Sequence, residues 1–386
     1  MSGADLNKGQ NSAKRSVPRK ILFVQTQAEN AGAQEISRII GEGLKQRGHD
    51  VHHLFFFRRT SGYDNQPNTG FCALERPSNP VAFIKFLFNL YREFRRIKPD
   101  ATLPLQHYGN VIGGAVARVA GLKNIIVSTT SAPEMMNRAV RAADLACGRL
   151  GIYDKIIVNS KDTQKHYESW PESYKRRMFR IDHGFEDKTV NVSKTDARIH
   201  LNLPQNITLL GCVARLHPAK LISANVALLA ENPGWHYAHA GQGPEYDALI
   251  AQAKQLGCAE RLHFLGELDP KTIGIFLAAL DVFVFPSLSE TFGLAPVEAA
   301  QAGVPVVANQ LPVLKEVLQS ETGACAVFAY ATDPQAFVSA VKLVLDDAKL
   351  RDDIIRSGRL LQNRYILDAM VDAYENLIEQ QIQGQS

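Results

Sequence analysis

Asp281-Val-Phe-Val-Phe-Pro286 is followed after three residues by Glu290-Thr-Phe-Gly-Leu-Ala-Pro-Val-Glu298, and the two segments together define one edge of an α/β sheet. The first segment is short, rich in β-branched and aromatic residues, and ended by proline, which predicts a buried parallel strand. Pro296 suits a first helical position, so a helix is expected next. Glu290 would then lie in the loop at the carboxyl end of the strand, and Glu298 in the first turn of the helix.

The loop between this strand and this helix is a candidate ligand site. In open α/β sheets, ligands bind at the carboxyl ends of the strands, and the free N–H groups near Gly293 and Leu294 suit a phosphate. A second interpretation is that Glu298 only complements the helix dipole while Glu290 is solvated. Short motifs often match by chance, so the spacing alone leaves both interpretations open.

The rest of the chain alternates short apolar runs with longer helical patterns, which is the signature of βαβ units and parallel sheets. The strand-like runs form two series, one over residues 20–159 and one over 207–307, so we expect an α/β protein of two doubly wound domains. A polar stretch with weak periodicity separates the two series. The expected segments are a loose tail (1–18), a first Rossmann-like domain (19–185), a linker (186–204), a second Rossmann-like domain (205–364) and a C-terminal helix (365–386).

Length and composition fit this organisation. A chain of 386 residues with 45% hydrophobic content can bury two cores of ordinary size. It contains no apolar run of about 18 residues, and residues 1–18 have no apolar core, so neither a transmembrane helix nor a secretory signal is expected. The five cysteines form no CxxC pair, which argues against a zinc site and a disulfide framework and favours a reducing cytoplasm.

Charge is divided unevenly along the chain. Residues 1–190 hold 29 of the 43 Lys and Arg but only 18 of the 39 Asp and Glu, which makes the first half basic and the second half acidic. This asymmetry indicates a polyanionic surface or an acidic substrate for the first domain. The basic residues are concentrated in 81–98, where an interfacial helix on anionic lipid is one interpretation. A helix packed on the sheet with a solvated basic end is the alternative, and it is favoured because amphipathic helices mostly face a core.

Two cations are expected at the same sheet edge as Glu290. Arg215 and Lys220 lie in Val213-Ala-Arg-Leu-His-Pro-Ala-Lys220, the loop after the first strand of the second domain. Such a pair would neutralise a departing diphosphate, as Arg and Lys do on phosphoryl groups. An Arg and a Lys five residues apart occur in many loops, so the pair by itself is a weak signal.

Glycines follow two of the expected strands. Gly241 and Gly243, in Gly241-Gln-Gly-Pro-Glu245, let the backbone approach a ligand or turn tightly into the next helix, and the tight turn is favoured. Gly32 could let a phosphate or sugar come close to the end of the first strand. A full GxGxxG pattern is missing there, which disfavours a nicotinamide dinucleotide site.

Taken in order, these motifs resemble the retaining glycosyltransferases of family four, which have the GT-B fold. The resemblance is strong over residues 207–345 and diffuse over 20–185. The motifs that carry it are Arg215 to Lys220, Gly241-Gln-Gly-Pro, Phe283-Val-Phe-Pro-Ser-Leu-Ser-Glu-Thr-Phe-Gly-Leu, and Glu298-Ala-Ala-Gln-Ala-Gly-Val-Pro-Val-Val307.

The resemblance implies a role for each motif residue. Arg215 and Lys220 would hold the nucleotide diphosphate, with Glu290 beside the donor sugar. Glu298 would accept hydrogen bonds from the ribose hydroxyls. Amides of Phe292, Gly293 and Leu294 would contact the diphosphate. The last helix would cross back onto the first domain.

Two positions depart from the family pattern. Relatives often place a His at the end of a first-domain strand near the donor sugar, whereas here Asn124-Ile-Ile-Val-Ser-Thr-Thr-Ser131 offers hydroxyls, including that of Thr130. His107 could substitute for it, although a structural histidine bonded to backbone is an equal alternative. The glycine that usually follows the loop lysine is Leu221 here, which would change that loop's backbone but leave its charge.

The expected activity is transfer of a sugar from a UDP- or GDP-type nucleotide-diphosphate sugar to a hydroxyl of a glycan or lipid-linked acceptor, with retention, in cell-envelope polysaccharide or lipopolysaccharide biosynthesis. We expect no cofactor and no metal, because no Asp-x-Asp signature is present and two cations are available. The acceptor should dock on the basic first domain, which would favour an anionic or lipid-linked glycan. No nucleic acid partner is expected. The chain would be cytoplasmic, with an anionic membrane surface at the inner face of the plasma membrane as a candidate partner.

Two other classes of function remain open from the sequence. A GT-B epimerase or an inverting transferase would share the fold but need a differently placed base. A noncatalytic nucleotide-sugar sensor, or a scaffold of a glycan assembly complex, would keep the binding residues without turnover.

Overall fold

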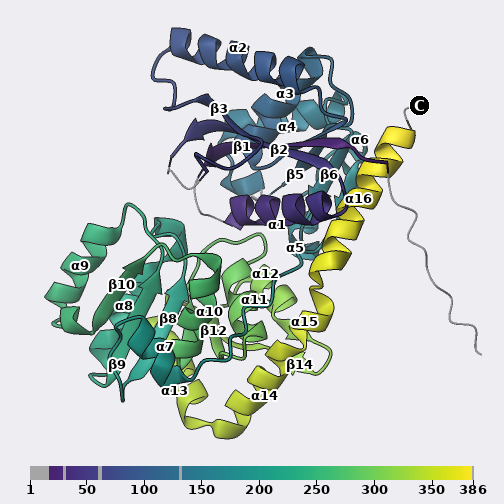
Figure 1. Ribbon diagram of the computed structural model, residues 1–386. Coiled ribbons are helices and arrows are strands. Elements are labelled where there is room, and N and C mark those ends of the chain that lie inside the picture. Colours follow the sequence, from purple (N-terminus) through teal and green to yellow (C-terminus); the bar gives the residue numbers. More distant parts are fainter. Residues whose placement is uncertain (1–16, 29–31, 60–62, 130–132, 385–386) are drawn as a thin grey trace, which may run out of the picture.

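In the computed structural model, the chain forms two α/β domains, and a long C-terminal helix runs from the second domain back along the first (Figure 1). The structure describes residues 17–28, 32–59, 63–129 and 133–384. The expected α/β architecture of two doubly wound domains is confirmed.

The first domain is built on parallel strands in the order β3-β2-β1-β4, continued by β5-β6-β7. Parallel bridges Thr102↔Ile125 and Leu105↔Ser128 join the two groups, so they form one twisted surface. All strands that the periodicity predicted in this half are present, while β3 and β7 were not predicted. The strands are β1 (Lys20–Ala28), β2 (Asp50–Arg58), β3 (Thr69–Ala73), β4 (Ala101–Pro104), β5 (Ile126–Ser128), β6 (Lys155–Val158) and β7 (Met178–Arg180).

The second domain has a parallel sheet in the order β10-β9-β8-β11-β12-β15 within the described residues. Its central strand β11 is buried at all four positions, as expected for a strand covered on both faces. The short pair β13 (Gln319–Ser320) and β14 (Gly323–Ala324) is antiparallel. The sheet strands are β8 (Thr208–Val213), β9 (Trp235–Ala240), β10 (Leu262–Gly266), β11 (Val282–Phe285), β12 (Val306–Asn309) and β15 (Ala326–Ala329).

Helices cover both faces of each sheet (Figure 1). Those of the first domain are α1 (Gly32–Gln46), α2 (Pro80–Ile97), α3 (Gly114–Val119), α4 (Arg138–Arg149), α5 (Lys161–Lys165) and α6 (Glu172–Lys175), with short turns η1 (Gly109–Gly113) and η2 (Pro133–Met135). Those that follow are α7 (Lys194–His200), α8 (Ile222–Glu231), α9 (Tyr246–Gln255), α10 (Pro270–Ala279), α11 (Leu294–Gln301), α12 (Pro312–Val317), α13 (Pro334–Asp346), α14 (Ala348–Arg359), α15 (Leu361–Arg364) and α16 (Leu367–Gln383), with short turns η3 (Pro218–Lys220) and η4 (Ala259–Arg261).

Helix α2 shows why residues 81–98 were ambiguous in the sequence. Phe86, Leu90, Phe94 and Ile97 recur at helical spacing and are buried in the first-domain core, so the packing interpretation is correct for this face. The Asn79 side chain accepts from the Ala82 N–H and caps the helix. Other apolar side chains of α2 remain exposed.

The C-terminal helix α16 completes the first domain. Its buried side chains share one hydrophobic cluster with α1 and with strand β1. The two helices approach closely at Gly43, where a Cβ would lie 2.6 Å from a methyl carbon of Val371. Bridges from Arg47 to Asp372 (2.6 Å) and from Arg19 to Glu379 (2.8 Å) flank this contact. The residues that α16 buries are Met370, Val371, Tyr374, Leu377 and Ile378.

The chain crosses between the domains twice, and the two crossings pack on each other. A parallel bridge pairs Phe185 with Ile366, and the Phe185 N–H donates to the Tyr365 carbonyl at 3.2 Å. A Cβ at Gly184 would lie 2.6 Å from the Leu367 Cα. Both crossings therefore form a single connection between the domains.

Part of the segment 186–204, which we expected to be a linker, is helical. Ser193 caps α7, and Ala197 and Leu203 belong to the second-domain core. The buried guanidinium of Arg198 donates to the Ala279 carbonyl and to Asp281 Oδ2 at 2.8 Å. The sequence did not predict this helix because the segment is polar. Its charged side chains find their partners only in the folded second domain.

Candidate functional site

A cleft of about 1370 Å³ lies between the carboxyl ends of the two sheets. It brings together all the predicted site residues that the structure describes, although they are spread over more than 260 positions of the sequence. Thr130 lies outside the described residues. The predicted residues that line the cleft are Gly32, His107, Arg215, Lys220, Gly241, Gly243, Glu290, Phe292, Gly293, Leu294 and Glu298.

Lys220 and Glu290 form an ion pair in which Nζ and Oε1 lie 2.5 Å apart. Lys220 ends the short turn η3, and the loop of Glu290 is tied to this turn by the Leu288 N–H, which donates to the Ala219 carbonyl at 2.8 Å. Leu221 has a φ of 48°. A left-handed leucine costs about 1–2 kcal/mol, so this position keeps the backbone that a glycine would favour at the expense of some strain.

Helix α11 begins two residues earlier than the sequence predicted. Gly293 ends the preceding loop with a φ of 89°, and a Cβ there would lie 2.6 Å from the Leu314 side chain. Leu294 is therefore the first helical residue, and Glu298 lies in the second turn rather than the first. Pro296 is tolerated because the first-turn N–H groups have no partner within the helix. Gly293 and Leu294 line the cleft at this helix terminus.

The carboxyl group of Glu298 has a strongly perturbed pKa. Burial raises this pKa to about 7, the nearby Lys188 ammonium lowers it, and the carboxylates of Glu35 and Glu186 raise it further. Since desolvation outweighs the attraction to Lys188, Glu298 is poised between its neutral and charged forms near neutral pH. Perturbed carboxyls in clefts often mark functional sites.

Gly241 and Gly243 are explained by packing against the loop of Arg215. A Cβ at Gly241 would lie 2.0 Å from the Ala214 carbonyl oxygen, and one at Gly243 would lie 2.1 Å from that of Leu216. Larger residues would push this loop out of place. The glycines thus position Arg215 as well as lining the cleft, which agrees with the tight-turn interpretation.

Residues 193–361 match the family described as "Glycosyl transferases group 1". The matched segment is 169 of the 386 residues and lies almost entirely in the second domain. The matched segment contains the loops of Arg215, Gly241 and Glu290, so the family match and the cleft rest on the same residues.

Curated relatives of this chain include proteins named for O-antigen and lipopolysaccharide core biosynthesis. The O-antigen biosynthesis glycosyltransferase WclY of Escherichia coli is 27% identical over 235 residues, covering 60% of this chain and 63% of WclY. The lipopolysaccharide core biosynthesis mannosyltransferase LpsB of Rhizobium meliloti is 32% identical over 212 residues, covering 51% and 60%. The chain thus spans about three fifths of the length of these relatives.

Solved structures share the whole architecture. Anabaena HepE, in complex with UDP and glucose, superposes with a TM-score of 0.80 at 18% identity and covers 94% of this chain and 99% of its own. WaaG, a glycosyltransferase involved in lipopolysaccharide biosynthesis, superposes with a TM-score of 0.71 at 16% identity, covering 93% and 99%. These likenesses establish the GT-B fold for this chain.

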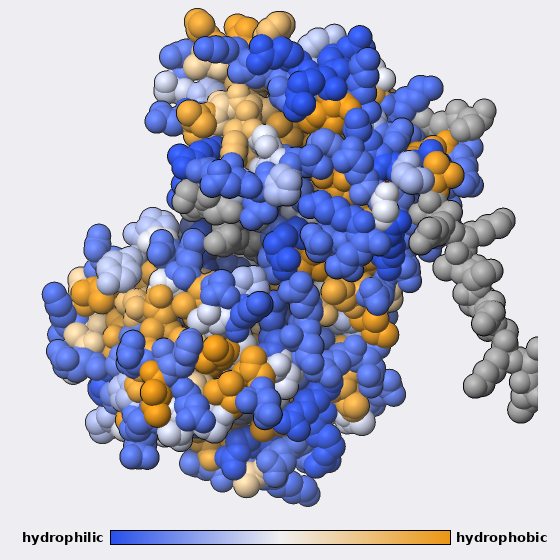
Figure 2. Space-filling model, viewed as in Figure 1, coloured by the Kyte–Doolittle hydropathy of each residue, from blue (hydrophilic) through white to orange (hydrophobic). Residues whose placement is uncertain are grey.

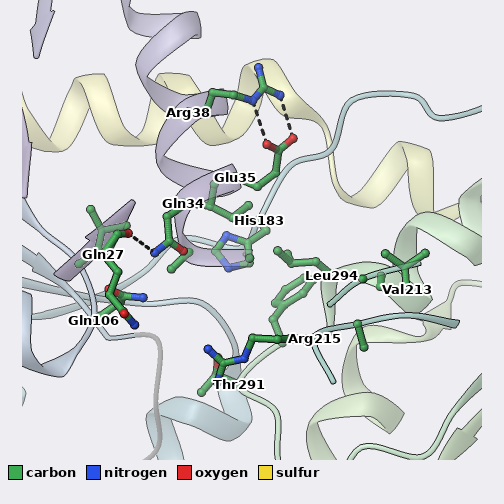
Figure 3. Close-up of a pocket in the computed structure, with 18 of the residues that line it drawn as sticks. Gln27, Gln34, Glu35, Arg38, Gln106, His183, Val213, Arg215, Thr291 and Leu294 are labelled. Atoms are coloured by element: carbon green, nitrogen blue, oxygen red, sulfur yellow. Dashed lines mark hydrogen bonds and ion pairs between the residues drawn. The ribbon is translucent and has the colours of Figure 1, made fainter. Parts of the chain in front are cut away.

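The sequence did not single out several residues that line the cleft. His183 is buried, and this burial lowers its pKa to about 3, so the imidazole is neutral. The Lys188 ammonium lies 3.1 Å from Glu186. Figure 3 shows Gln27, Gln34 and Gln106 across the cleft from Arg215 and Leu294. These residues belong to no charged motif that the sequence made apparent. Only their position could have indicated them: Gln27 at the end of β1, Gln34 in the first turn of α1, Gln106 after β4, and His183 and Lys188 in the interdomain crossing.

His107 lies in the cleft wall rather than bonded to backbone. Burial lowers its pKa, and its buried Nδ1 has no partner among the described residues. Within the described ranges, no group of three or more His, Cys, Asp or Glu side chains is placed to hold a metal ion. Nor does any described helix combine the length and apolar character needed to cross a bilayer.

Proposed function

We propose that this chain is a retaining glycosyltransferase that moves a sugar from a nucleotide-diphosphate sugar to a hydroxyl group of a glycan or lipid-linked acceptor. One observation carries the proposal: Arg215, the Lys220–Glu290 pair and the amino terminus of α11 all meet in one cleft between two Rossmann-like domains. Cations and helix N–H groups that converge in this way suit a diphosphate, whose charge grows as it leaves.

In the proposed reaction, the bond between the anomeric carbon and the diphosphate oxygen breaks while a bond to the acceptor oxygen forms on the same face. The departing phosphate oxygen takes the acceptor proton, which balances the charge without a protein base. Arg215, Lys220 and the amide of Leu294 stabilise the leaving diphosphate. Glu290 lies beside the sugar, where it orients Lys220 through the 2.5 Å contact. Product stereochemistry by NMR separates this route from an inverting reaction.

Glu298 is proposed to bind the ribose of the donor. Its carboxylate can accept two hydrogen bonds from neighbouring hydroxyls, and these offset the desolvation that raises its pKa. The neutralising role of Arg215 and Lys220 leads us to propose that no metal ion is needed. Activity should then be unchanged in EDTA, and a loss that Mg²⁺ or Mn²⁺ restores would contradict this part of the proposal.

The pathway proposed is synthesis of cell-envelope polysaccharide or lipopolysaccharide, because WclY and LpsB carry such names. A UDP-type donor is favoured over a GDP-type donor, since HepE binds UDP and glucose. The chain would act in the cytoplasm.

Helix α2 is proposed to rest on an anionic membrane surface. Val81, Ile84 and Phe88 expose 76%, 65% and 62% of their surface on the face opposite the core. Figure 2 shows apolar side chains, beside hydrophilic ones, at the end of the molecule where Figure 1 places α2. An exposed apolar stripe with basic neighbours suits the interface of an anionic bilayer. The basic neighbours that are exposed are Arg76, Lys85, Arg92, Arg95 and Arg96.

Co-sedimentation with vesicles tests this placement. Vesicles of phosphatidylglycerol should bind the protein and vesicles of phosphatidylcholine should not. The triple change Val81→Ser, Ile84→Ser and Phe88→Ser should abolish binding, while Leu343→Ser, an exposed leucine on α13, should leave it unchanged. Equal loss in both variants would contradict a site on α2.

A thermal-shift panel of UDP, GDP, ADP and their sugars tests the donor site. A nucleotide present at 100 times its dissociation constant should stabilise the protein by about 2.7 kcal/mol. Slow hydrolysis of the stabilising donor would support an enzyme. Binding without any hydrolysis or transfer would instead favour a sensor or scaffold, and no stabilisation by any nucleotide would overturn the proposed function.

A further inference from the structure

Part of the first-domain wall of the cleft is built from uncharged polar side chains, and Arg59 lines the cleft beside it. Thr26 and Gln27 end β1, Gln34 lies in the first turn of α1, and Gln106 and His107 follow β4. The parallel register of β1 and β4 places these segments at one edge of the sheet. This wall faces the charged wall that the second domain contributes (Figure 3).

Gln34 presents a fixed hydrogen-bond acceptor that lacks a donor. Its side chain is fully buried, and Nε2 donates to the Gln27 carbonyl at 2.7 Å, as the dashed line in Figure 3 shows. Because the Gln27 partner is a carbonyl oxygen, it must face the NH₂ group of the Gln34 amide. The oxygen Oε1 therefore points in the other direction. Oε1 is buried without a partner among the described residues. An unsatisfied buried acceptor is costly, so this atom calls for an O–H or N–H group from a ligand.

Two further atoms of the same wall have no partner within the described residues: Thr26 Oγ1 and His107 Nδ1. A hydroxyl can donate or accept, and the buried imidazole of His107 is neutral because its pKa is lowered. Gln106 Oε1 accepts from the Thr26 N–H at 3.3 Å, which holds the two segments together. The wall thus offers donors and acceptors without net charge.

The charged side chains near this wall are engaged with one another. Arg38 pairs with Glu35 at 2.8 Å and with Glu186 at 3.2 Å. Lys45 lies 3.9 Å from Glu42. Arg59, an exposed residue that also lines the cleft, donates to Gln27 Oε1 at 3.5 Å. The exposed basic residues of α2, which led us to expect an anionic acceptor, lie outside the cleft-lining set.

We propose that Gln34, Thr26 and His107 form a subsite for the hydroxyl groups of a neutral sugar, which is the accepting end of the acceptor. This proposal rests on the proposed function and specifies the chemical class of its acceptor. A fixed carbonyl oxygen attracts a hydroxyl, whereas a carboxylate or phosphate brings no donor and would face the Gln34 oxygen with like charge. A site built to pair a hydroxyl rejects analogues that leave its buried groups unpaired.

Saturation-transfer NMR on the full chain with saturating UDP tests the subsite. The probes are p-nitrophenyl glucoside, galactoside, mannoside and N-acetylglucosaminide, with p-nitrophenyl glucuronide as the anionic comparison. At least one neutral glycoside should show ring-proton signals and bind at least tenfold more tightly than the glucuronide. Gln34→Leu and, separately, Thr26→Val should each weaken that binding about tenfold.

Gln25→Leu is the matched control for Gln34→Leu. Gln25 is also a fully buried glutamine whose Oε1 lacks a partner among the described residues, but it bonds Ser37 and is absent from the cleft lining. Gln25→Leu should leave glycoside binding unchanged while lowering the melting temperature as much as Gln34→Leu does. Thr26→Val tests the subsite if Gln34→Leu fails to fold.

Nucleotide binding distinguishes a failure of the donor site from a failure of the acceptor subsite. If UDP and GDP both fail to bind the wild-type chain, the proposed function fails. If a nucleotide binds but the glucuronide binds as well as the neutral glycosides, or if Gln34→Leu and Thr26→Val keep full glycoside binding, the subsite is overturned and the donor site stands. If both variants weaken the nucleotide and leave the glycosides unaffected, the hydroxyls they bind belong to the donor, and the acceptor assignment is overturned.

Discussion

The two walls of the cleft use opposite chemistry. The second-domain wall carries Arg215, Lys220, Glu290 and Glu298, while the part of the first-domain wall around Gln34 carries carboxamides, a hydroxyl and a neutral imidazole. Charged first-domain residues also line the cleft, and they bond to neighbours of the same domain, as in the Arg38–Glu35 pair and the contact of Arg59 with Gln27. A diphosphate needs full charges, because its own charge increases as it leaves. A sugar needs paired donors and acceptors, because its hydroxyls are neutral. The difference indicates that one wall handles the leaving group and the other the attacking group.

Among the substitutions that test this difference between the walls, Glu290→Gln should have the largest effect on the rate of sugar transfer. The change removes the charge that holds the Lys220 ammonium at 2.5 Å, and we expect transfer to fall by about a thousandfold while nucleotide binding is kept. Initial rates of nucleoside diphosphate release measure it. Glu321→Gln, at an exposed position of the same domain, is the control. Full activity in Glu290→Gln would remove Glu290 from the mechanism.

Lys220→Met should have the second largest effect on the rate of sugar transfer. It removes one cation from the diphosphate site and leaves Glu290 without its partner, so we expect kcat to fall by about a hundredfold and nucleotide binding to weaken. Isothermal calorimetry with UDP and GDP, combined with the same rate assay, measures both effects. Lys342→Met changes an exposed lysine on α13 and should behave as wild type. Unchanged nucleotide affinity in Lys220→Met would place the diphosphate elsewhere.

Glu298→Gln should change stability in a manner that depends on pH. The folded-state pKa of Glu298 is about 7, above its ordinary 4.5. Wild type therefore loses stability as pH rises through 7, because a desolvated carboxyl must ionise, and the glutamine variant has no such loss. In chemical denaturation without nucleotide, the variant should match wild type near pH 4.5 and exceed it by about 3 kcal/mol at pH 8, since each pKa unit corresponds to about 1.4 kcal/mol. An equal difference at both pH values would contradict the raised pKa.

Arg38→Met should have the smallest effect. The half-exposed pairs of Arg38 with Glu35 and Glu186 are worth about 0.5 kcal/mol, and this variant should change kcat by less than twofold. Urea denaturation and the rate assay measure the two quantities. A tenfold loss of kcat would show that the first-domain wall also acts through charge, which would blur the contrast between the walls.

The second-domain wall could be predicted from the sequence because its residues stand out locally. Charged residues directly after buried strands, as in Arg215 after β8 and Glu290 after β11, fall at one sheet edge by the rules of parallel sheets. The helix start was misjudged by two residues at Leu294, because the left-handed Gly293 ends the loop earlier than Pro296 suggested.

The first-domain wall could not be predicted in the same way. Gln34 and Thr26 are ordinary polar residues in the sequence, and their importance depends on which of their atoms remain unpartnered after folding. The same limit applies to α7, where a polar segment gains its helix from contacts of Arg198 with residues about 80 positions away. Tertiary pairing, rather than local pattern, decides both cases.

Helix α16 has a consequence for the order in which the chain folds during synthesis. The first domain buries side chains such as Val371 and Tyr374, which follow its other residues by about 180 positions. On a ribosome, the second domain is therefore translated in full before the first can close its hydrophobic core. The nascent amino-terminal half therefore keeps the apolar face of α1 uncovered until α16 has been synthesised.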